Sequence, residues 1–153
     1  MNPEDRLSEL GLELPAVPSP AGSYIPAKRL GNLVFTAGQL PLVDAELSLE
    51  GKVGSDVSVE EAAGAARICA LNALAAAAEV AGGLANITSV AKVVGFVASA
   101  EGFNGQPQVI NGASDLLGEV FGEAGRHARS AVGVAELPLG SPVEVEVIFE
   151  VSS

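Results

Sequence analysis

HARSAVGVAELPLGSPVEVEVIFEV, residues 127–151, predicts two successive β-strands separated by a turn that contains proline and glycine. Side chains alternate between the two faces of a strand. In the second strand one face is entirely apolar, which predicts that it lies on the core: Val143, Val145, Val147, Phe149 and Val151. The opposite face carries Glu144, Glu146, Ile148 and Glu150, a pattern typical of a solvated acidic surface.

The first of these strands begins with an arginine. Arg129 shares its face with the small residues Ala131 and Gly133, and we expect the opposite face, with Ser130, Val132 and Val134, to lie on the core. Small side chains beside a guanidinium predict a hollow suited to a carboxylate or phosphate. The alternative is a structural salt bridge to a carboxylate of the last strand, of which a hairpin at residues 137–141 would bring Glu144 nearest.

Residues upstream predict an α+β fold in which two main helices cover a sheet. Ser58 and Glu61 form a capping box that begins a helix ending near Val80, and this helix is apolar over so much of its circumference that we expect a subunit contact. A second helix is predicted over 106–122, with its apolar set at Val109, Ile110, Ala113, Leu116, Leu117, Val120 and Phe121. Strands are predicted over 32–41 and 87–99.

The chain divides into an N-terminal segment, residues 1–21, and a single domain, residues 22–153. A short helix over 3–11 closes at Gly11, and the three prolines within 14–22 favour an extended arm laid over the domain. A length of 153 residues is that of one ordinary domain.

Charge and composition disfavour several partners. The net charge of −11, with only 8 Lys and Arg residues, argues against nucleic acid. The most apolar stretch, 68–85, is interrupted by Asn72, Glu79 and two glycines, which indicates a buried helix rather than a membrane span. The start of the chain does not resemble a secretory signal, and a single cysteine suits a reducing compartment, so we expect a cytoplasmic protein.

The usual catalytic and metal-binding patterns are missing from the sequence. One histidine, His127, and one cysteine, Cys69, disfavour a metal site or a Cys–His dyad. We expect Cys69 to be a core residue and His127 to be structural or exposed. The residues alone therefore lead to an anion-binding site in a small α+β protein.

Three ordered motifs resemble the RidA (YjgF/YER057c/UK114) family: GSYIPA (22–27), GNLVFTAGQLP (31–41) and ARSAVGVAELPLGSPVEVEVIFEV (128–151). The resemblance extends from about Gly22 to Val151. The N-terminal arm and the form INGASDLLGEVFGEAGRHARS (110–130) are similar to a longer subgroup described as RidA-like or endoribonuclease L-PSP proteins.

The resemblance implies a chorismate-mutase-like fold and a homotrimer with a central barrel-like core and ligand clefts between subunits. It implies hydrolysis of reactive 2-imino or enamine acids to 2-oxo acids and ammonia, with no metal or organic cofactor. The implied partner is a small carboxylate-bearing metabolite, with no nucleic acid and no membrane.

Roles carry over to individual residues of this chain. Arg129 matches the arginine that binds the substrate carboxylate, and Glu144 matches the acidic residue that holds or activates water. Tyr24 matches the tyrosine that lines the cleft, and Gly38 matches the glycine at which backbone approaches the ligand.

Three positions depart from the family pattern. Ala131 stands where active members commonly carry cysteine, His127 where proline is usual, and Pro26 where glutamine is common. If only the backbone carbonyl of residue 131 contacts the water, alanine is tolerated there. The departures predict a reshaped cleft that takes a bulkier substrate or binds a carboxylate without turnover.

Three functions follow as hypotheses. An imine deaminase requires Arg129 and Glu144 to meet in one cleft, with Glu144 in reach of a bound water. A non-catalytic ligand-binding trimer keeps Arg129 but has Glu144 turned away or paired elsewhere. An endoribonuclease, the older label of the family, requires a basic groove, and the charge of −11 and the single histidine disfavour it.

Overall fold

The computed structural model describes residues 2–20 and 22–153. Its helices and strands confirm the predicted α+β class. In chain order they are α1 (Pro3–Glu9), β1 (Ala27–Leu30), β2 (Leu33–Thr36), β3 (Leu42–Val43), β4 (Glu46–Leu47), α2 (Val59–Ala81), η1 (Leu84–Asn86), β5 (Ile87–Ala98), α3 (Gln106–Phe121), η2 (Gly122–Gly125), β6 (Ala128–Val134), η3 (Pro138–Gly140) and β7 (Val143–Val151).

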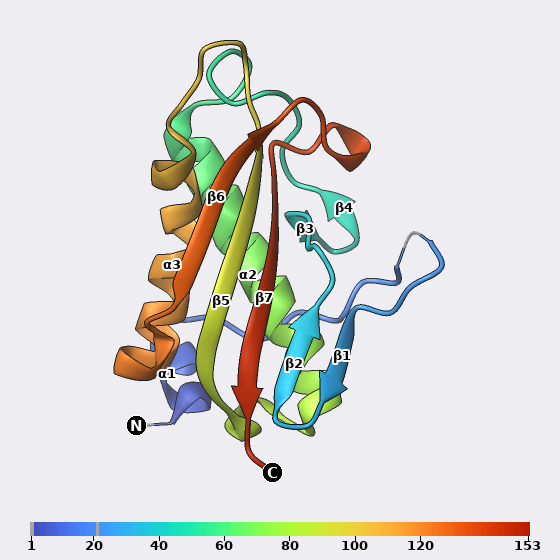
Figure 1. Cartoon of the computed structure of the whole chain (residues 1–153), viewed down its shortest axis with the longest axis vertical. Helices are drawn as coiled ribbons and strands as arrows, with labels where there is room; N and C mark the ends of the chain where they lie inside the picture. Colours follow the sequence, from blue (N-terminus) through green and yellow to red (C-terminus); the bar gives the residue numbers. More distant parts are fainter. Residues whose placement is uncertain (1, 21) are drawn as a thin grey trace.

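Within the described residues, five strands form one sheet in the order β1-β2-β7-β5-β6 (Figure 1). β5 lies between β6 and β7, parallel to the first and antiparallel to the second. Parallel strands need a long crossover, which α3 supplies between β5 and β6. The expected hairpin between the last two strands is therefore wrong, because β5 occupies the position between them.

The capping box that begins α2 is confirmed. The Glu61 backbone N–H donates to Ser58 Oγ and the Ser58 N–H donates to Glu61 Oε1, each at 3.1 Å. Gly82 ends the helix in the left-handed conformation, with φ of 83°. These local interactions set both ends of the helix close to the predicted bounds.

The apolar circumference of α2 is covered within the chain itself. The helix packs against α3 and against β7, and Asn72 in its middle is buried. Asn72 Nδ2 donates to the carbonyl oxygens of Leu40 and Leu42, both at 3.1 Å. Among the described residues of α2, only Val80 is an exposed large hydrophobic side chain. The leftover apolar surface expected on α2 is therefore largely absent, and a subunit contact through this helix stays a prediction.

The two helices lie on one face of the sheet, behind it in Figure 1. They approach closely where glycines occur. A Cβ at Gly112 would overlap the carbonyl oxygen of Ala63 on α2, and a Cβ at Gly95 would overlap the side chain of Ile110 on α3. The predicted apolar set of α3 is buried in full, from Val109 to Phe121.

The two faces of the sheet differ in whether helices pack on them. On the helix-covered face Val93 pairs with Val147, and both are buried, as the alternation of β7 predicts. On the other face, here called the open face, Phe96 pairs with Glu144 of β7 and with Val132 of β6. Val132 is 44% exposed, so the expectation that its face of β6 lies on the core is wrong. The short strand β6 has helix α3 on its Arg129 face instead.

The N-terminal segment packs on the same core. Leu7 of α1 is buried, and Gly11 ends that turn with φ of 73°. Leu12, Leu14 and Val17 pack against the core without regular structure. Met1 and Ala21, which belong to the predicted arm, lie outside the described residues.

By length and composition, α2 could cross a membrane, and it is the one helix in the described part of the chain that passes this test. Most of its apolar window is buried in the fold, which is typical of a core helix.

Candidate functional site

Glu144 projects from β7 onto the open face and is half-buried there. Burial raises the pKa of its carboxyl, and the nearby carboxylate of Glu146 raises it further. Both residues lie on the same face of β7, two positions apart. A carboxyl of this kind holds its proton more strongly than an exposed glutamate does, which suits proton exchange with a ligand.

Gly38 lies directly against this carboxyl group. A Cβ at position 38 would be 2.7 Å from Cδ and 3.0 Å from Oε1 of Glu144, so a side chain here would displace the carboxyl. The segment that follows is fixed by paired backbone hydrogen bonds between Gln39 and Val145. Gly38 therefore brings the backbone against the Glu144 carboxyl, and its expected approach to a ligand stays a prediction.

Glu144 and Gly38 line a pocket with a volume of about 460 Å³, and Tyr24 borders this pocket as well. The Tyr24 side chain is 50% exposed. Within the described residues the lining of this pocket, here called the Glu144 pocket, is Tyr24, Gly38, Leu40, Phe96, Pro138, Leu139, Glu144 and Glu146. Three of the five predicted site residues are thus brought together. The arm residues Pro18 and Pro20 reach a smaller adjoining pocket that Tyr24 and Gly38 also line.

Arg129 lies on the opposite face of the sheet from the Glu144 pocket. It pairs with Val93, whose side chain belongs to the helix-covered face, whereas Glu144 is on the open face and β5 separates the two strands. Arg129 Nη1 donates to Asn111 Oδ1 at 2.7 Å and to Ser114 Oγ at 3.2 Å, both on α3. Among the ion pairs of the described residues none involves Arg129, so the structural salt bridge weighed above is wrong.

Ala131 shares the face of Arg129 and packs, partly buried, against the core. The small residues there do not leave the expected hollow, because α3 fills the space. A Cβ at Gly133 would be 2.8 Å from Gln106 Nε2, at the start of that helix. Small side chains on β6 therefore allow α3 to approach the strand. The Arg129 side chain lies against this helix and bonds to Asn111 and Ser114.

His127 and Cys69 have different surroundings. His127 Nε2 is 2.9 Å from Ser114 Oγ and Nδ1 is 2.6 Å from the carbonyl oxygen of Gly125, so the histidine is held in place. Cys69 is buried in α2, as expected. Burial raises the pKa of its thiol, and the negative charge of Glu144 raises it further, which makes the thiol unreactive.

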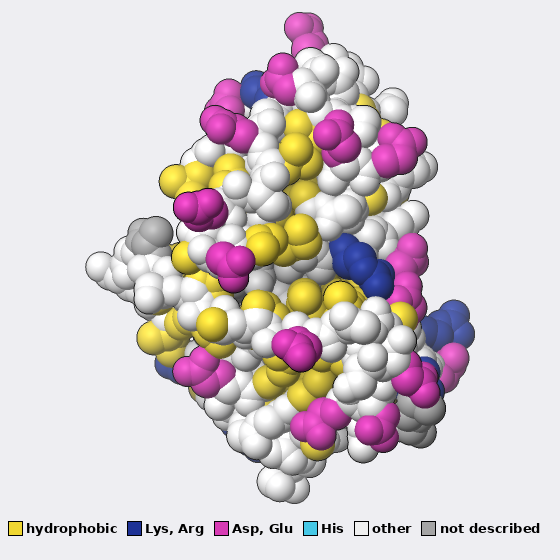
Figure 2. Space-filling view, turned by 180° about the vertical axis from the view of Figure 1, so that it is seen from behind, with side chains coloured by type: hydrophobic (Ala, Val, Ile, Leu, Met, Phe, Trp, Pro, Cys, Tyr) yellow, Lys and Arg dark blue, Asp and Glu magenta, His cyan; other side chains and the backbone are white. Residues whose placement is uncertain are grey.

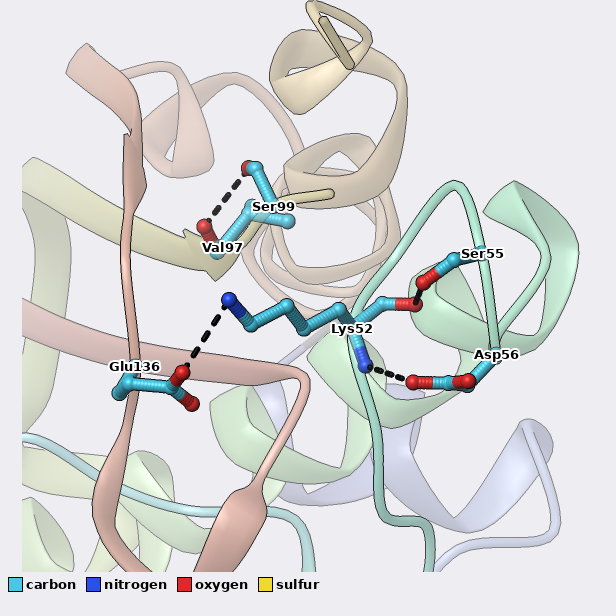
Figure 3. Close-up of polar contacts among 6 residues, drawn as sticks. All are labelled: Lys52, Ser55, Asp56, Val97, Ser99 and Glu136. Carbon is cyan, nitrogen blue, oxygen red and sulfur yellow. Dashed lines mark hydrogen bonds and ion pairs between the residues drawn. The ribbon is translucent and has the colours of Figure 1, made fainter. Parts of the chain in front are cut away.

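A second polar pocket lies at the end of the sheet where Lys52 pairs with Glu136 (Figure 3). The Lys52 Nζ to Glu136 Oε1 distance is 3.1 Å, and the Glu136 side chain is 75% exposed. The Lys52 N–H donates to Asp56 Oδ2 at 3.1 Å, which closes the loop before α2. An exposed pair of this kind contributes little energy, and its role is to hold two loops together.

Comparison with known proteins identifies the family. The model described as "YjgF/chorismate_mutase-like, putative endoribonuclease" matches residues 4–151. The chain belongs to the YjgF/RidA family. The YjgF/RidA resemblance expected from the three motifs is therefore confirmed, with the chorismate-mutase-like fold.

Individual relatives of this YjgF/RidA chain match over nearly its whole length. Protein TCP17 of Trypanosoma cruzi is 42% identical over 148 residues, 96% of this chain and 92% of that protein. A 2-iminobutanoate/2-iminopropanoate deaminase of Dermatophagoides farinae is 33% identical over 138 residues, 90% of this chain and 92% of the relative. A crystal structure of an endoribonuclease-labelled protein from Shewanella oneidensis is 36% identical, covers 99% of this chain and 100% of the other, and has a TM-score of 0.95.

The site residues that sequence reasoning missed include an aromatic and an acidic residue of the Glu144 pocket and two partners of Arg129. Phe96 and Glu146 line the Glu144 pocket, and Asn111 and Ser114 hold Arg129. Glu146 shares the alternation of Glu144 and could have been grouped with it. Asn111 and Ser114 lie three residues apart on one helix face, but nothing in their spacing connects them to a strand that begins 14 residues later.

Proposed function

We propose that this protein hydrolyses 2-imino acids to 2-oxo acids and ammonia, without a cofactor, as a cytoplasmic homotrimer. The observation that carries the proposal is the half-buried carboxyl of Glu144, whose pKa is raised, in an open pocket bordered by Tyr24 and Gly38. The likeness to the mite deaminase supports the same chemistry. The buried, unpaired Cys69 fits a reducing compartment.

The active site is proposed to form between two subunits. Arg129 and Glu144 are on opposite faces of the sheet in one chain, and β6 is an edge strand with one unpaired side. The open face keeps exposed apolar side chains, among them Phe35 and Val132, which a second copy would cover. In this arrangement Arg129 of one subunit completes the Glu144 pocket of the next.

The chemistry follows from the two groups. Arg129 binds the substrate carboxylate through paired N–H donors and fixes the imine carbon above Glu144. Glu144 accepts a proton from water as the water oxygen bonds to that carbon, while the C=N π electrons move to nitrogen, which takes up a proton. The carbinolamine then collapses: its hydroxyl proton passes by way of Glu144 to the amino nitrogen, the C–N bond breaks as C=O forms, and ammonia leaves. Ala131 retains the backbone carbonyl that a water could contact.

The helix-covered side of the molecule gives no support to nucleic-acid binding. On the helix-covered side, Figure 2 shows acidic side chains spread widely and few basic ones. This distribution fits the net charge of −11 and repels a phosphate backbone.

The test is hydrolysis of 2-iminobutanoate generated in place by a threonine dehydratase. Glu144→Gln is expected to lower kcat about 10²- to 10⁴-fold, as loss of a general acid–base group does. Arg129→Ala is expected to raise KM, and its control Arg126→Ala removes an exposed arginine nearby that pairs with Glu123. A wild-type protein that binds 2-oxobutanoate without accelerating hydrolysis would support the non-catalytic binding protein instead.

Mixed trimers test the shared site. Arg129→Ala and Glu144→Gln subunits are refolded together in equal amounts, so that mixed trimers hold one site built from an intact Arg129 and an intact Glu144. At a substrate concentration far below KM, where each variant alone is nearly inactive, cyclic symmetry then predicts recovery of about a quarter of the wild-type activity. A site made within one subunit recovers none.

A further inference from the structure

A continuous set of hydrogen bonds connects Arg129 to the backbone of the turn before β6. Arg129 Nη1 donates to Ser114 Oγ at 3.2 Å. Ser114 Oγ is 2.9 Å from Nε2 of His127, and Nδ1 of the same ring is 2.6 Å from the carbonyl oxygen of Gly125. The set joins α3, η2 and β6 at one point.

The positions of the hydrogens in this set follow from its ends. The Gly125 carbonyl can only accept, so His127 Nδ1 carries a hydrogen. In the neutral ring Nε2 is then an acceptor, and the Ser114 hydroxyl must donate to it. This turns the lone pairs of Ser114 Oγ toward Arg129, whose Nη1 can only donate. Each donor meets an acceptor when His127 is the Nδ1–H tautomer.

The contacts also fix which edge of the guanidinium is free. Nη1 carries both short bonds, to Asn111 Oδ1 and to Ser114 Oγ. Nη2 has a contact of 3.5 Å with the Pro107 carbonyl oxygen, and no hydrogen bond of Nε is present among the described residues. The Nε–Nη2 edge is therefore the one left for a bidentate carboxylate.

We propose that His127 is a positioning residue that acts through Ser114 to hold Arg129 with its Nε–Nη2 edge toward the ligand. The inference rests on the proposed function in so far as the ligand is the carboxylate of a 2-imino or 2-oxo acid. Without the imidazole, the Ser114 hydroxyl is free to rotate, and its lone pairs no longer face Nη1. The long Arg129 side chain then samples rotamers that do not present this edge.

Two replacements of His127 separate its two hydrogen bonds. In His127→Asn the side-chain amide can still donate to Gly125 but does not reach Ser114. In His127→Gln the longer side chain can place an acceptor oxygen where Nε2 was. We expect His127→Asn to raise KM for 2-iminobutanoate about five- to tenfold, with kcat within about twofold of wild type, and His127→Gln to restore KM.

The dependence on Ser114 is tested by a double-mutant cycle. Ser114→Ala is expected to raise KM by a similar factor, and the double variant Ser114→Ala/His127→Asn to be no worse than Ser114→Ala. Additive losses would show that His127 acts independently of Ser114 and overturn the proposal. Equal losses in His127→Asn and His127→Gln would also overturn it, since a bulk effect is then sufficient.

A readout independent of turnover keeps this inference apart from the proposed function. His127 is the only histidine, so the ¹⁵N resonances of its ring are assigned without ambiguity. We expect the Nδ1–H tautomer in the wild type, and faster exchange of the Arg129 Nη1 hydrogens in His127→Asn than in wild type or His127→Gln. If 2-iminobutanoate is not hydrolysed, these signals still decide: an Nε2–H tautomer or unchanged Arg129 exchange overturns the positioning role.

Discussion

On β7, Phe149 is fully buried against the helices, whereas its chain neighbour Ile148 lies on the open face and keeps part of its surface accessible. The same contrast holds along β5 and β2. The helix-covered face is apolar along β5 and β7, and the open face mixes Phe35, Phe96 and Val132 with the carboxylates of Glu144 and Glu146. The helix-covered face of these strands therefore supplies most of the apolar burial, and the open face keeps apolar and acidic groups accessible.

The largest expected effect is a loss of stability, and it distinguishes the two faces of the sheet directly. Phe149→Ala removes a ring that is 0% exposed and packs 6.2 Å from the ring of Phe121. We expect a loss of about 3–5 kcal/mol in the free energy of unfolding. Ile148→Ala, one residue away, should cost about 1 kcal/mol or less. Urea unfolding at one fixed protein concentration measures both, and equal losses would contradict the contrast.

A smaller effect concerns the contact of the two helices that cover the sheet. Gly112→Ala places a methyl group against the Ala63 carbonyl and should destabilise the protein by about 1–3 kcal/mol. Gly118→Ala, on the same helix, meets no atom within 4 Å and should stabilise by up to about 1 kcal/mol. Thermal unfolding of both variants gives the sign, and destabilisation by Gly118→Ala would refute the packing account.

The open face is tested by association. Val132 on β6 and Val80 on α2 are similarly exposed, at 44% and 39%, but lie on different sides of the molecule. Val132→Glu should weaken self-association at least about tenfold, which is about 1.4 kcal/mol. Val80→Glu should leave it unchanged. Sedimentation velocity over a concentration series measures both, and dissociation by Val80→Glu alone would place the interface on the helix side.

The smallest effect is the pH dependence of Glu144. Its pKa is raised by burial first and by Glu146 second, so the folded state binds this proton more tightly than the unfolded state does. The cost to stability is absent at low pH, grows as pH rises through the ordinary glutamate range toward the raised pKa, and is complete above it. Glu144→Gln should therefore raise Tm at neutral pH and leave it unchanged at about pH 3, below the ordinary pKa of about 4.3.

Features governed by local interactions were predictable from the sequence. The capping box at Ser58 and Glu61, the apolar set of α3 and the alternation of β7 depend on residues close together in the chain, and each is observed. The grouping of Tyr24, Gly38 and Glu144 followed only from the family resemblance. These residues meet because the segment after β2 pairs with β7, which is more than 100 residues away in the chain.

The orientation of β6 was not predictable from its own residues. Its valines suggested a core face, but the residues that decide the question are Val93 and Gly95 of β5 and the helix that covers them. An edge strand has one neighbouring strand, so its own side-chain pattern does not show which of its faces a helix covers. The hydrogen-bond partners of Arg129 were missed because α3 had no predicted position relative to that strand.

The order of strands also has a consequence for synthesis on the ribosome. β2 pairs with β7, Val34 opposite Phe149, and the Val151 N–H donates to the carbonyl oxygen of Asn32 at 2.8 Å. The unit β5–α3–β6 is contiguous and can form as it emerges, because the loop that it closes is short. β1 and β2 are made first, yet they gain their place in the sheet only when the last residues leave the exit tunnel. A fragment of the chain that ends before residue 143, once free of the ribosome, should therefore form the β5–α3–β6 unit but lack the strand with which β2 pairs.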